Sequence, residues 1–372
     1  MNKAEIKATR PVMPAFDQYV QEIHSIWESG SMTNNGKKVQ KFRDMLADYL
    51  GNPNVDVFVN GHSALLLAIR AMDLEGEVIT SPFTFTSTTN AIIQSGLTPV
   101  FGDIDASYNL NPDGIEELIT DRTSAIITPH IFGIPCDVDK IERIAKKHDL
   151  KVIYDGAQAF GTKVHGKPIS MYGDMTMFSF HAIKVFNTIE GGALVYQDAG
   201  LRQQFELYRN FGVSYGEDGN DVMVCGMNAK MNEFQAAMGI VNLPLHEQEV
   251  GKRKALAEVY CDCLKDVPGI STYPYDAEVD YNYAYFPVKV VGEEYGLTRD
   301  ALWKKLKEQK IETRKLYDKL TCDYSCYKDK GYVKRTAYAD KVKNNTLDLP
   351  MYGSLTKEDV CYICEAIRKF GE

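Results

Sequence analysis

The turn that contains Lys184 offers the clearest chemistry in this sequence of 372 residues. It lies in MTMFSFHAIKVFNTIEGGALVY, residues 175–196, where an apolar run ends at Ser179 and an E-G-G tripeptide opens the next run. A lysine held in a partly desolvated turn can lose its proton and add to an aldehyde carbonyl, forming a Schiff base. Most lysines are simply solvated, so this chemistry requires supporting neighbours.

A carboxylate at the end of a second apolar run is one such neighbour. In KVIYDGAQAFG, residues 151–161, the run ends at Asp155, and Gln158 follows three residues later. The carboxylate could pair with a pyridinium nitrogen and raise the pKa of that nitrogen, so that the ring stays protonated and accepts electrons. Aspartates at strand ends also cap helices or bind metals, and this segment alone leaves those roles open.

A third segment could bind an anion. NGHSALLLAI, residues 60–69, places a strand end at Asn60-Gly61 and a helix start near His62 or Ser63. Free backbone N–H groups at a helix N-terminus favour a phosphate, and the Ser63 hydroxyl could join them. The alternative is that Ser63 only caps its helix, because serine is a favoured N-cap residue.

Repeated strand-like runs predict the scaffold that positions these segments. Most are continuously apolar, which is typical of strands buried on both faces of a parallel sheet. They occupy residues 55–60, 77–81, 99–104, 124–130, 151–155, 175–180 and 191–196. Helical patterns lie between several of them, at residues 64–72, 112–119 and 137–150. We therefore expect a mostly parallel α/β sheet with helices on both faces and ligands at its carboxyl edge.

The last third of the chain has a different pattern. The expected elements are a long helix from about Met231 to Asp266, a strand at 283–291, and helices at 298–309 and from Lys357. This mixture predicts a smaller α+β domain. We therefore expect a large ligand-binding domain over residues 1–240 and a small domain over residues 241–372.

Composition excludes several classes of protein. The formal net charge is −9 without a dense Lys/Arg run, which argues against nucleic acid or an anionic membrane as the main partner. No stretch approaches the roughly 20 apolar residues that span a bilayer, and the N-terminal residues lack a secretory core, so we expect a cytoplasmic protein. Cys361 and Cys364 form a lone C-x-x-C in a helical pattern, and we expect no metal site.

The chemical segments occur in the order of a known family. D-x-x-Q, then S-F-H-x-x-K and then E-G-G resemble the DegT-type sugar-nucleotide aminotransferases, which use pyridoxal 5'-phosphate (PLP) and have fold type I. Other blocks extend the resemblance over nearly the whole chain: SMTNNGKKVQKFRDMLADYLG, NGHSALLLAI, SPFTFTSTTNAI, GLTPVFGDID, IPCDVDKIERIAKKH and GMNAKMNEFQAAMG. The resemblance implies a mostly parallel seven-stranded sheet covered by helices on both faces, plus a smaller α+β C-terminal domain.

The resemblance also implies roles around the cofactor ring. Lys184 would hold PLP as a Schiff base and then move a proton between its C4' atom and the substrate carbon. Asp155 would pair with the pyridine nitrogen, and Gln158 would lie near O3'. Phe85, in SPFTFTST, would stack on the ring; the alternative is a core aromatic beside a buried strand.

The cofactor phosphate would be held from two chains. His62 and Ser63 would contribute the turn at the helix start, Ser179 its hydroxyl, and Asn228 would reach in from a second subunit. The resemblance thus implies a homodimer with shared active sites. The alternative for Asn228 is a turn residue after Gly226.

Two residues depart from the family pattern. His62 replaces the threonine usual in N-G-T, so a hydroxyl contact is lost and only the backbone N–H remains. Ile189 replaces the glycine often found in G-E-G-G, which could narrow the approach to the cofactor. We expect His181 to support the site structurally, since a lone histidine without partner ligands is usually a satisfied structural group.

The closest resemblance within the family is to enzymes that aminate C4 of a keto sugar. The implied reaction transfers the amino group of L-glutamate to dTDP-4-keto-6-deoxy-D-glucose, giving dTDP-4-amino-4,6-dideoxy-D-glucose and 2-oxoglutarate. Two alternatives remain: an aminotransferase for a 3-keto or other nucleotide keto sugar, and a non-catalytic PLP-binding regulator. Arg314 is a candidate contact for the sugar-nucleotide diphosphate, and the alternative is a solvated surface arginine.

Overall fold

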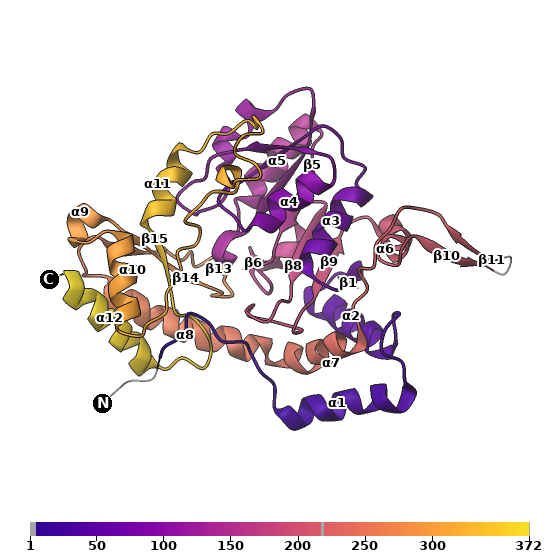
Figure 1. Cartoon of the computed structure of the whole chain (residues 1–372), viewed down its shortest axis with the longest axis horizontal. Coiled ribbons are helices and arrows are strands. Elements are labelled where there is room, and N and C mark those ends of the chain that lie inside the picture. The colour runs from indigo at the N-terminus through magenta and orange to yellow at the C-terminus, as the bar shows by residue number, and fades with distance from the viewer. Residues whose placement is uncertain (1–4, 217–218, 372) are drawn as a thin grey trace.

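A seven-stranded sheet organises the larger part of the computed structural model, which describes residues 5–216 and 219–371 (Figure 1). Its strands are β1 (Val55–Phe58), β2 (Glu77–Thr80), β3 (Thr98–Phe101), β4 (Thr123–Pro129), β5 (Lys151–Asp155), β8 (Met175–Ser179) and β9 (Gly192–Tyr196). Their order is β1-β9-β8-β5-β4-β2-β3, and β9 runs antiparallel to both of its neighbours. The remaining pairs are parallel, so the expected mostly parallel sheet is confirmed.

Helices cover both faces of this sheet because alternate strand residues point to opposite sides. Ile126 belongs to the apolar core under one face, whereas Ala125 and Ile127 belong to the core under the other. The first face is covered by α2 (Lys37–Leu50), α5 (Val138–His148) and α7 (Glu233–Asn242). The second is covered by α3 (Gly61–Ala71), α4 (Thr86–Gln94) and α6 (Arg202–Tyr208).

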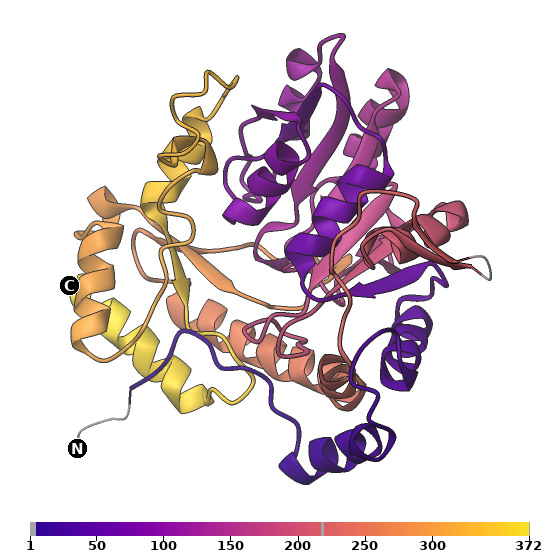
Figure 2. The same cartoon turned by 45° about the vertical axis from the view of Figure 1, so that its right-hand side comes forward.

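The C-terminal part has its own sheet and its own apolar core. Figure 2 shows its helices gathered on one side of the molecule. The antiparallel strands are β12 (Ile270–Thr272), β14 (Phe286–Val290) and β15 (Thr346–Leu349). The accompanying helices are α8 (His246–Leu264), α9 (Gly292–Tyr295), α10 (Arg299–Glu308), α11 (Ala337–Asn345) and α12 (Lys357–Gly371). The smaller α+β part is confirmed. Ile6 packs into this second core, so an N-terminal segment crosses to it, and the division between residues 240 and 241 stays a proposal.

The remaining elements complete the chain. Besides 3-10 turns, they are the 14-residue helix α1 (Phe16–Ser29), the projecting hairpin of β10 (Val213–Gly216) and β11 (Gly219–Val222), and the small sheet of β6 (Lys163–Val164), β7 (Lys167–Pro168) and β13 (Val279–Asp280). The sequence pattern did not predict α1. In the described part of the chain, no helix is both long and apolar enough to cross a bilayer.

Two helix predictions were wrong. The expected long helix is interrupted by a 3-10 turn at Leu243–Leu245, because Pro244 cannot donate to the preceding turn of an α-helix. Residues 112–119 form only two 3-10 turns, Pro112–Gly114 and Glu116–Leu118. This segment is too short to stabilise a helix by itself, and Gly114 weakens it further.

An aromatic cluster joins the two parts. Phe83 and Phe132 from the large part pack with Tyr281, Tyr285 and Tyr317 from the small part. The ring centroids of Phe83 and Tyr317 are 5.4 Å apart and perpendicular. The small part is therefore held directly over the carboxyl edge of the large sheet.

Candidate active site

A cavity of about 500 Å³ opens between the two parts at the carboxyl ends of β4, β5 and β8. Its walls include Asn60, Gly61, His62, Phe85, Asp155, Gln158, Ser179, His181, Lys184, Glu190, Tyr285, Arg314, Leu316 and Tyr317. Three segments that are distant in sequence thus meet here, as the parallel sheet predicts. The lining residues of the small part were missed by sequence reasoning, apart from Arg314.

Asp155 provides a buried carboxylate at the end of β5. The Thr88 hydroxyl donates to its Oδ2 at 2.7 Å, and the Ala157 backbone N–H donates to its Oδ1 at 3.0 Å. Burial raises the pKa of Asp155, while those two donors, and then the nearby charges of Lys184 and His62, lower it. Sequence reasoning did not assign Thr88 a role, although it lies within the SPFTFTSTTNAI block.

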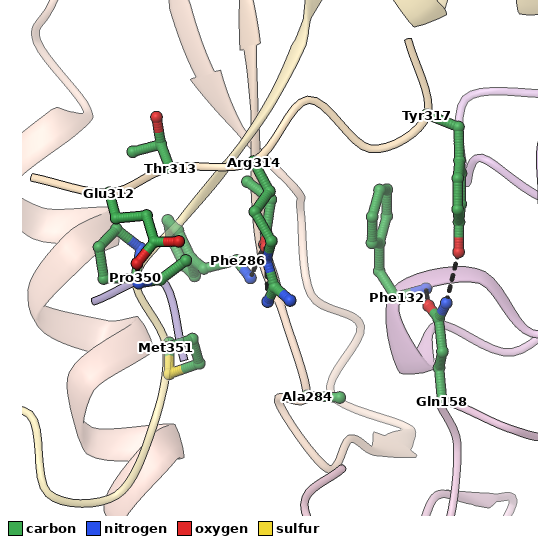
Figure 3. A network of polar contacts seen from close by, with 12 residues as sticks. Phe132, Gln158, Ala284, Phe286, Glu312, Thr313, Arg314, Tyr317, Pro350 and Met351 are labelled. Atoms are coloured by element: carbon green, nitrogen blue, oxygen red, sulfur yellow. Dashed lines mark hydrogen bonds and ion pairs between the residues drawn. The ribbon is translucent and has the colours of Figure 1, made fainter. Parts of the chain in front are cut away.

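Gln158 is fixed in orientation at both ends of its amide (Figure 3). The Phe132 backbone N–H donates to its Oε1 at 2.6 Å, and its Nε2 donates to the Tyr317 hydroxyl at 2.6 Å. The Asn282 side chain also donates to the Gln158 carbonyl at 2.8 Å. The amide keeps one Nε2 hydrogen free of these contacts, because an amide nitrogen carries two.

Lys184 stands in a tight turn after β8. Its backbone N–H donates to the His181 carbonyl at 2.9 Å, and its side chain is half-buried. Among the described residues, none forms a hydrogen bond or ion pair with the Lys184 amine. His181 Nε2 lies 3.4 Å from a carboxylate oxygen of Glu190, and both residues line the cavity.

The start of α3 approaches the end of β8 closely. A Cβ atom added at Gly61 would lie 2.9 Å from the Ser179 Cβ, so glycine is required for this approach. The Asn60 side chain caps the helix by accepting from the Ser63 N–H at 2.8 Å. The alternative reading of Ser63 as the cap was therefore wrong. Ser63 is buried in the first helical turn and does not line the cavity.

The structure also shows where three other residues named in the sequence analysis lie. Phe85 is 63% exposed in the cavity wall, so the alternative of a core aromatic was wrong. Ile189 is exposed with a φ of 70° and does not line the cavity, so the expected narrowing is not seen. Asn228 forms a backbone bridge with Asn210 and lies outside the cavity of its own chain.

The described residues contain no group of three or more His, Cys, Asp or Glu side chains that could hold a metal ion. Cys361 and Cys364 are free thiols on α12. Burial raises the pKa of Cys364, which disfavours the thiolate that a metal would need. The lone C-x-x-C therefore fits the helical reading.

The fold and the cavity are those expected of a PLP-dependent transferase of fold type I. Comparison with known proteins identifies the group: the DegT/DnrJ/EryC1/StrS aminotransferase family matches over residues 16–368, and the chain belongs to this family. It is 36% identical over 365 residues to dTDP-4-amino-4,6-dideoxy-D-glucose transaminase of Shigella dysenteriae, covering 98% of each chain. The chain is thus a PLP-dependent sugar-nucleotide aminotransferase.

Solved structures agree in shape over the full chain. DesI, crystallised with its TDP-sugar product, superposes with a TM-score of 0.93 at 29% identity, covering 99% of this chain and 93% of DesI. Helicobacter pylori PseC, an aminotransferase of pseudoaminic acid biosynthesis, superposes with a TM-score of 0.93 at 26% identity and 99% coverage of both chains. The expected fold is therefore confirmed.

The residues present fit PLP. A buried carboxylate, Asp155, faces the same cavity as Lys184, whose amine has no hydrogen-bond or ion-pair partner in the described part of the chain. The helix start at Gly61 and the Ser179 side chain lie together at one end of β8, where backbone N–H groups and a hydroxyl can hold a phosphate. His62 joins them, with its Nδ1 2.8 Å from the Ser87 hydroxyl.

Proposed function

We propose that this enzyme transfers the amino group of L-glutamate to C4 of dTDP-4-keto-6-deoxy-D-glucose. The products are dTDP-4-amino-4,6-dideoxy-D-glucose and 2-oxoglutarate. One observation carries the proposal of amino transfer: Lys184 and the buried Asp155 face one cavity in a family of sugar aminotransferases. The choice of sugar is supported by the relative from Shigella dysenteriae named for the same C4-amino sugar.

Lys184 is the proposed proton carrier. PLP supplies, when bound, an aldehyde for the amino group and an electron sink for the carbon that loses its proton. The Lys184 amine takes that proton and returns it during each half of the reaction, acting as base and then as acid. The absence of a hydrogen-bond or ion-pair partner for this amine among the described residues leaves it free for both tasks.

The other residues of the site bind the cofactor and orient its ring. Asp155 keeps the ring nitrogen protonated, and Gln158 presents its free Nε2 hydrogen near O3'. Phe85 covers one ring face. His62 and Ser179 hold the phosphate from this chain, and Ser63, whose backbone N–H already donates to Asn60, contributes its hydroxyl.

Asn228 of a second copy completes the phosphate site in this proposal. Asn228 lies outside the cavity of its own chain, on the segment that follows the projecting β10–β11 hairpin. From this position, the Asn228 side chain can reach the phosphate site of a neighbouring subunit. We therefore propose a homodimer with shared active sites.

Isotope transfer tests the reaction directly. The PLP-loaded enzyme is incubated with ¹⁵N-labelled L-glutamate and dTDP-4-keto-6-deoxy-D-glucose, and the products are examined by mass spectrometry and NMR. We expect ¹⁵N at C4 of the sugar and an equal amount of 2-oxoglutarate. Lys184→Arg keeps the positive charge but should form neither product.

Parallel incubations separate the alternatives. Label at C3 with a 3-keto sugar, or faster turnover of a UDP- or GDP-linked keto sugar, would replace the proposed substrate. No 2-oxoglutarate with any nucleotide keto sugar would instead favour a PLP-binding regulator.

A further inference from the structure

A second cavity, of about 150 Å³, lies between the large and small parts of the chain. One side is formed by residues 105–108 of the large part, and the other by β12, β14, β15 and α11 of the small part. Among the described residues, none lines both this cavity and the candidate active site. Sites for drug-sized ligands occupy about 300–1,000 Å³, so the second cavity suits a compact molecule.

The small sheet turns a polar face toward this second cavity. Val288 and Val290 of β14 belong to the apolar core of the small part, so Lys289 between them points to the opposite face. Ser271 on β12 and Thr346 on β15 lie directly opposite Lys289 in the pairing register and therefore share its face. All three residues of this polar row line the second cavity.

Helix α11 supplies another wall. It leads directly into β15 (Figure 1), and the Thr346 hydroxyl donates to the Val342 carbonyl at 2.9 Å, which holds the end of the helix against the sheet. Lys341 and Asn345 are four residues apart, so they lie on one side of α11, and both line the second cavity. The cavity is thus approached by one lysine from the sheet and by another from the helix.

Several donors in this wall have no partner. Among the described residues, none forms a hydrogen bond or ion pair with the amines of Lys289 and Lys341, the amide of Asn345 or the hydroxyl of Ser271. Lys343 on the same helix, by contrast, forms ion pairs. Each of the four groups carries a hydrogen that it can donate. The second cavity therefore offers free donors to a ligand.

The charge of the wall selects an anion. Asp105 is the carboxylate of the described wall, and its Oδ1 already accepts from the Ser107 N–H at 2.8 Å and from the Ser107 hydroxyl at 2.5 Å. Two ammonium groups against one carboxylate give this wall a net positive charge, in a chain whose formal net charge is −9. A cation would be repelled, and an apolar molecule would leave the donors unsatisfied.

We propose that the second cavity binds a compact oxyanion with two negative charges, which is either a phosphate or a short dicarboxylate. The two charges match the ammonium groups of Lys289 and Lys341, while Asn345 and Ser271 donate to the ligand oxygens. The ligand contacts both parts of the chain, so its binding stabilises their docked arrangement. This binding site is separate from the proposed amino transfer and does not depend on which keto sugar reacts.

Calorimetry tests the proposal with two probes. The PLP-loaded enzyme, whose cofactor phosphate site is filled, is titrated with orthophosphate and separately with succinate, at an ionic strength held constant with chloride. Lys289→Gln/Lys341→Gln removes both ammonium groups from the second cavity. Lys252→Gln/Lys254→Gln is the matched control, because these two lysines are exposed on α8 and line neither cavity.

The expected result is saturable binding that depends on the cavity lysines. Lys289→Gln/Lys341→Gln should raise the Kd at least about tenfold, because each lost contact is a hydrogen bond to a charged group. Lys252→Gln/Lys254→Gln should leave the Kd unchanged. The probe with the lower Kd identifies the ligand as a phosphate or a dicarboxylate. That probe should also raise the thermal unfolding midpoint of the unsubstituted enzyme and of the control, but not that of the cavity variant.

Lysine acetylation followed by mass spectrometry locates the bound anion. The tighter probe should slow the acetylation of Lys289 and Lys341 and leave the rate at Lys252 and Lys254 unchanged. Saturable binding of neither probe would overturn the proposal. An equal Kd in the unsubstituted enzyme and the cavity variant, or an equal increase in both double variants, would also overturn it, because the anion would then bind elsewhere or respond only to the overall charge.

Discussion

The Thr88 hydroxyl donates a hydrogen bond of 2.7 Å to Oδ2 of Asp155, within a fully buried environment. This contact partly offsets the burial that raises the pKa of Asp155. It therefore helps to keep the carboxylate charged, which is the state that can hold a protonated ring nitrogen. A residue of α4 thus supports the proposed chemistry of a residue at the end of β5.

Thr88→Val should weaken this support without changing the side-chain shape. We expect kcat/KM for glutamate to fall about ten- to a hundredfold, because a hydrogen bond to a charged group contributes roughly 1.5–3 kcal/mol. The spectrum of the bound cofactor should titrate at lower pH than in the unsubstituted enzyme, because the ring nitrogen loses its proton more easily. Steady-state kinetics and a spectrophotometric pH titration measure both effects.

Thr89→Val is the matched control. Thr89 is equally buried on the same helix, but its hydroxyl donates to Thr321 at 2.9 Å rather than to Asp155. The Thr89→Val variant should be less stable, but its cofactor spectrum should titrate at the same pH as in the unsubstituted enzyme. Equal spectral changes in both variants would show that the effect comes from α4 packing and not from the Asp155 contact.

Substitutions of Phe85 and Phe83 should have different effects, the first on cofactor binding and the second on stability. Phe85 is 63% exposed in the cavity, whereas Phe83 is fully buried in the aromatic cluster. Phe85→Ala should weaken PLP binding about three- to tenfold through lost stacking and leave thermal unfolding of the apoprotein nearly unchanged. Phe83→Ala should cost about 3–5 kcal/mol of stability. A large stability loss in Phe85→Ala would contradict the stacking role.

The sheet was predictable because its signals are local. Continuous apolar runs identified all seven strands, and parallel geometry then brought Asp155, Ser179 and Lys184 to one edge. The departures were also local in origin. Pro244 divides the helix predicted from Met231 to Asp266, and Asn60 rather than Ser63 caps α3.

The cavity roof could not be predicted in the same way. Tyr317 meets Gln158 across 159 residues of sequence, and Arg314 meets Asp348 through pairing in a separate sheet. No periodicity encodes such contacts, because they depend on how the two parts dock. The proposed role of Asn228 could not be predicted from local patterns either, because it needs a second chain.

Ile189→Gly should stabilise the enzyme. Ile189 has a φ of 70°, where a β-branched side chain collides with its own backbone. Glycine relieves this strain at some cost in chain entropy, and we expect a net gain of about 1 kcal/mol. Ile183→Gly, in the same loop between β8 and β9 but without a positive φ, should instead lose about 0.5–1 kcal/mol. Thermal unfolding at equal PLP saturation measures both, and shifts in the same direction would refute the strain argument.

His246→Phe should remove part of the sensitivity to acid. His246 is 2% exposed, neither ring nitrogen has a hydrogen-bond partner among the described residues, and burial lowers its pKa to about 3. The unfolded chain binds a proton near pH 6.5 and the folded chain does not, so stability falls as the pH drops from about 6.5 toward 3. At pH 5 this single group costs about 2 kcal/mol.

Phenylalanine fits the site because the rings of Tyr49, Phe160 and Phe186 already surround His246. Denaturant unfolding at pH 7.5 and pH 5 should show a smaller loss of stability in the variant than in the unsubstituted enzyme. His24→Gln is the control, because His24 is exposed on α1 and its replacement should leave the pH dependence intact. An unchanged slope in His246→Phe would mean that His246 takes up a proton in the folded enzyme, contrary to its buried and unpaired setting.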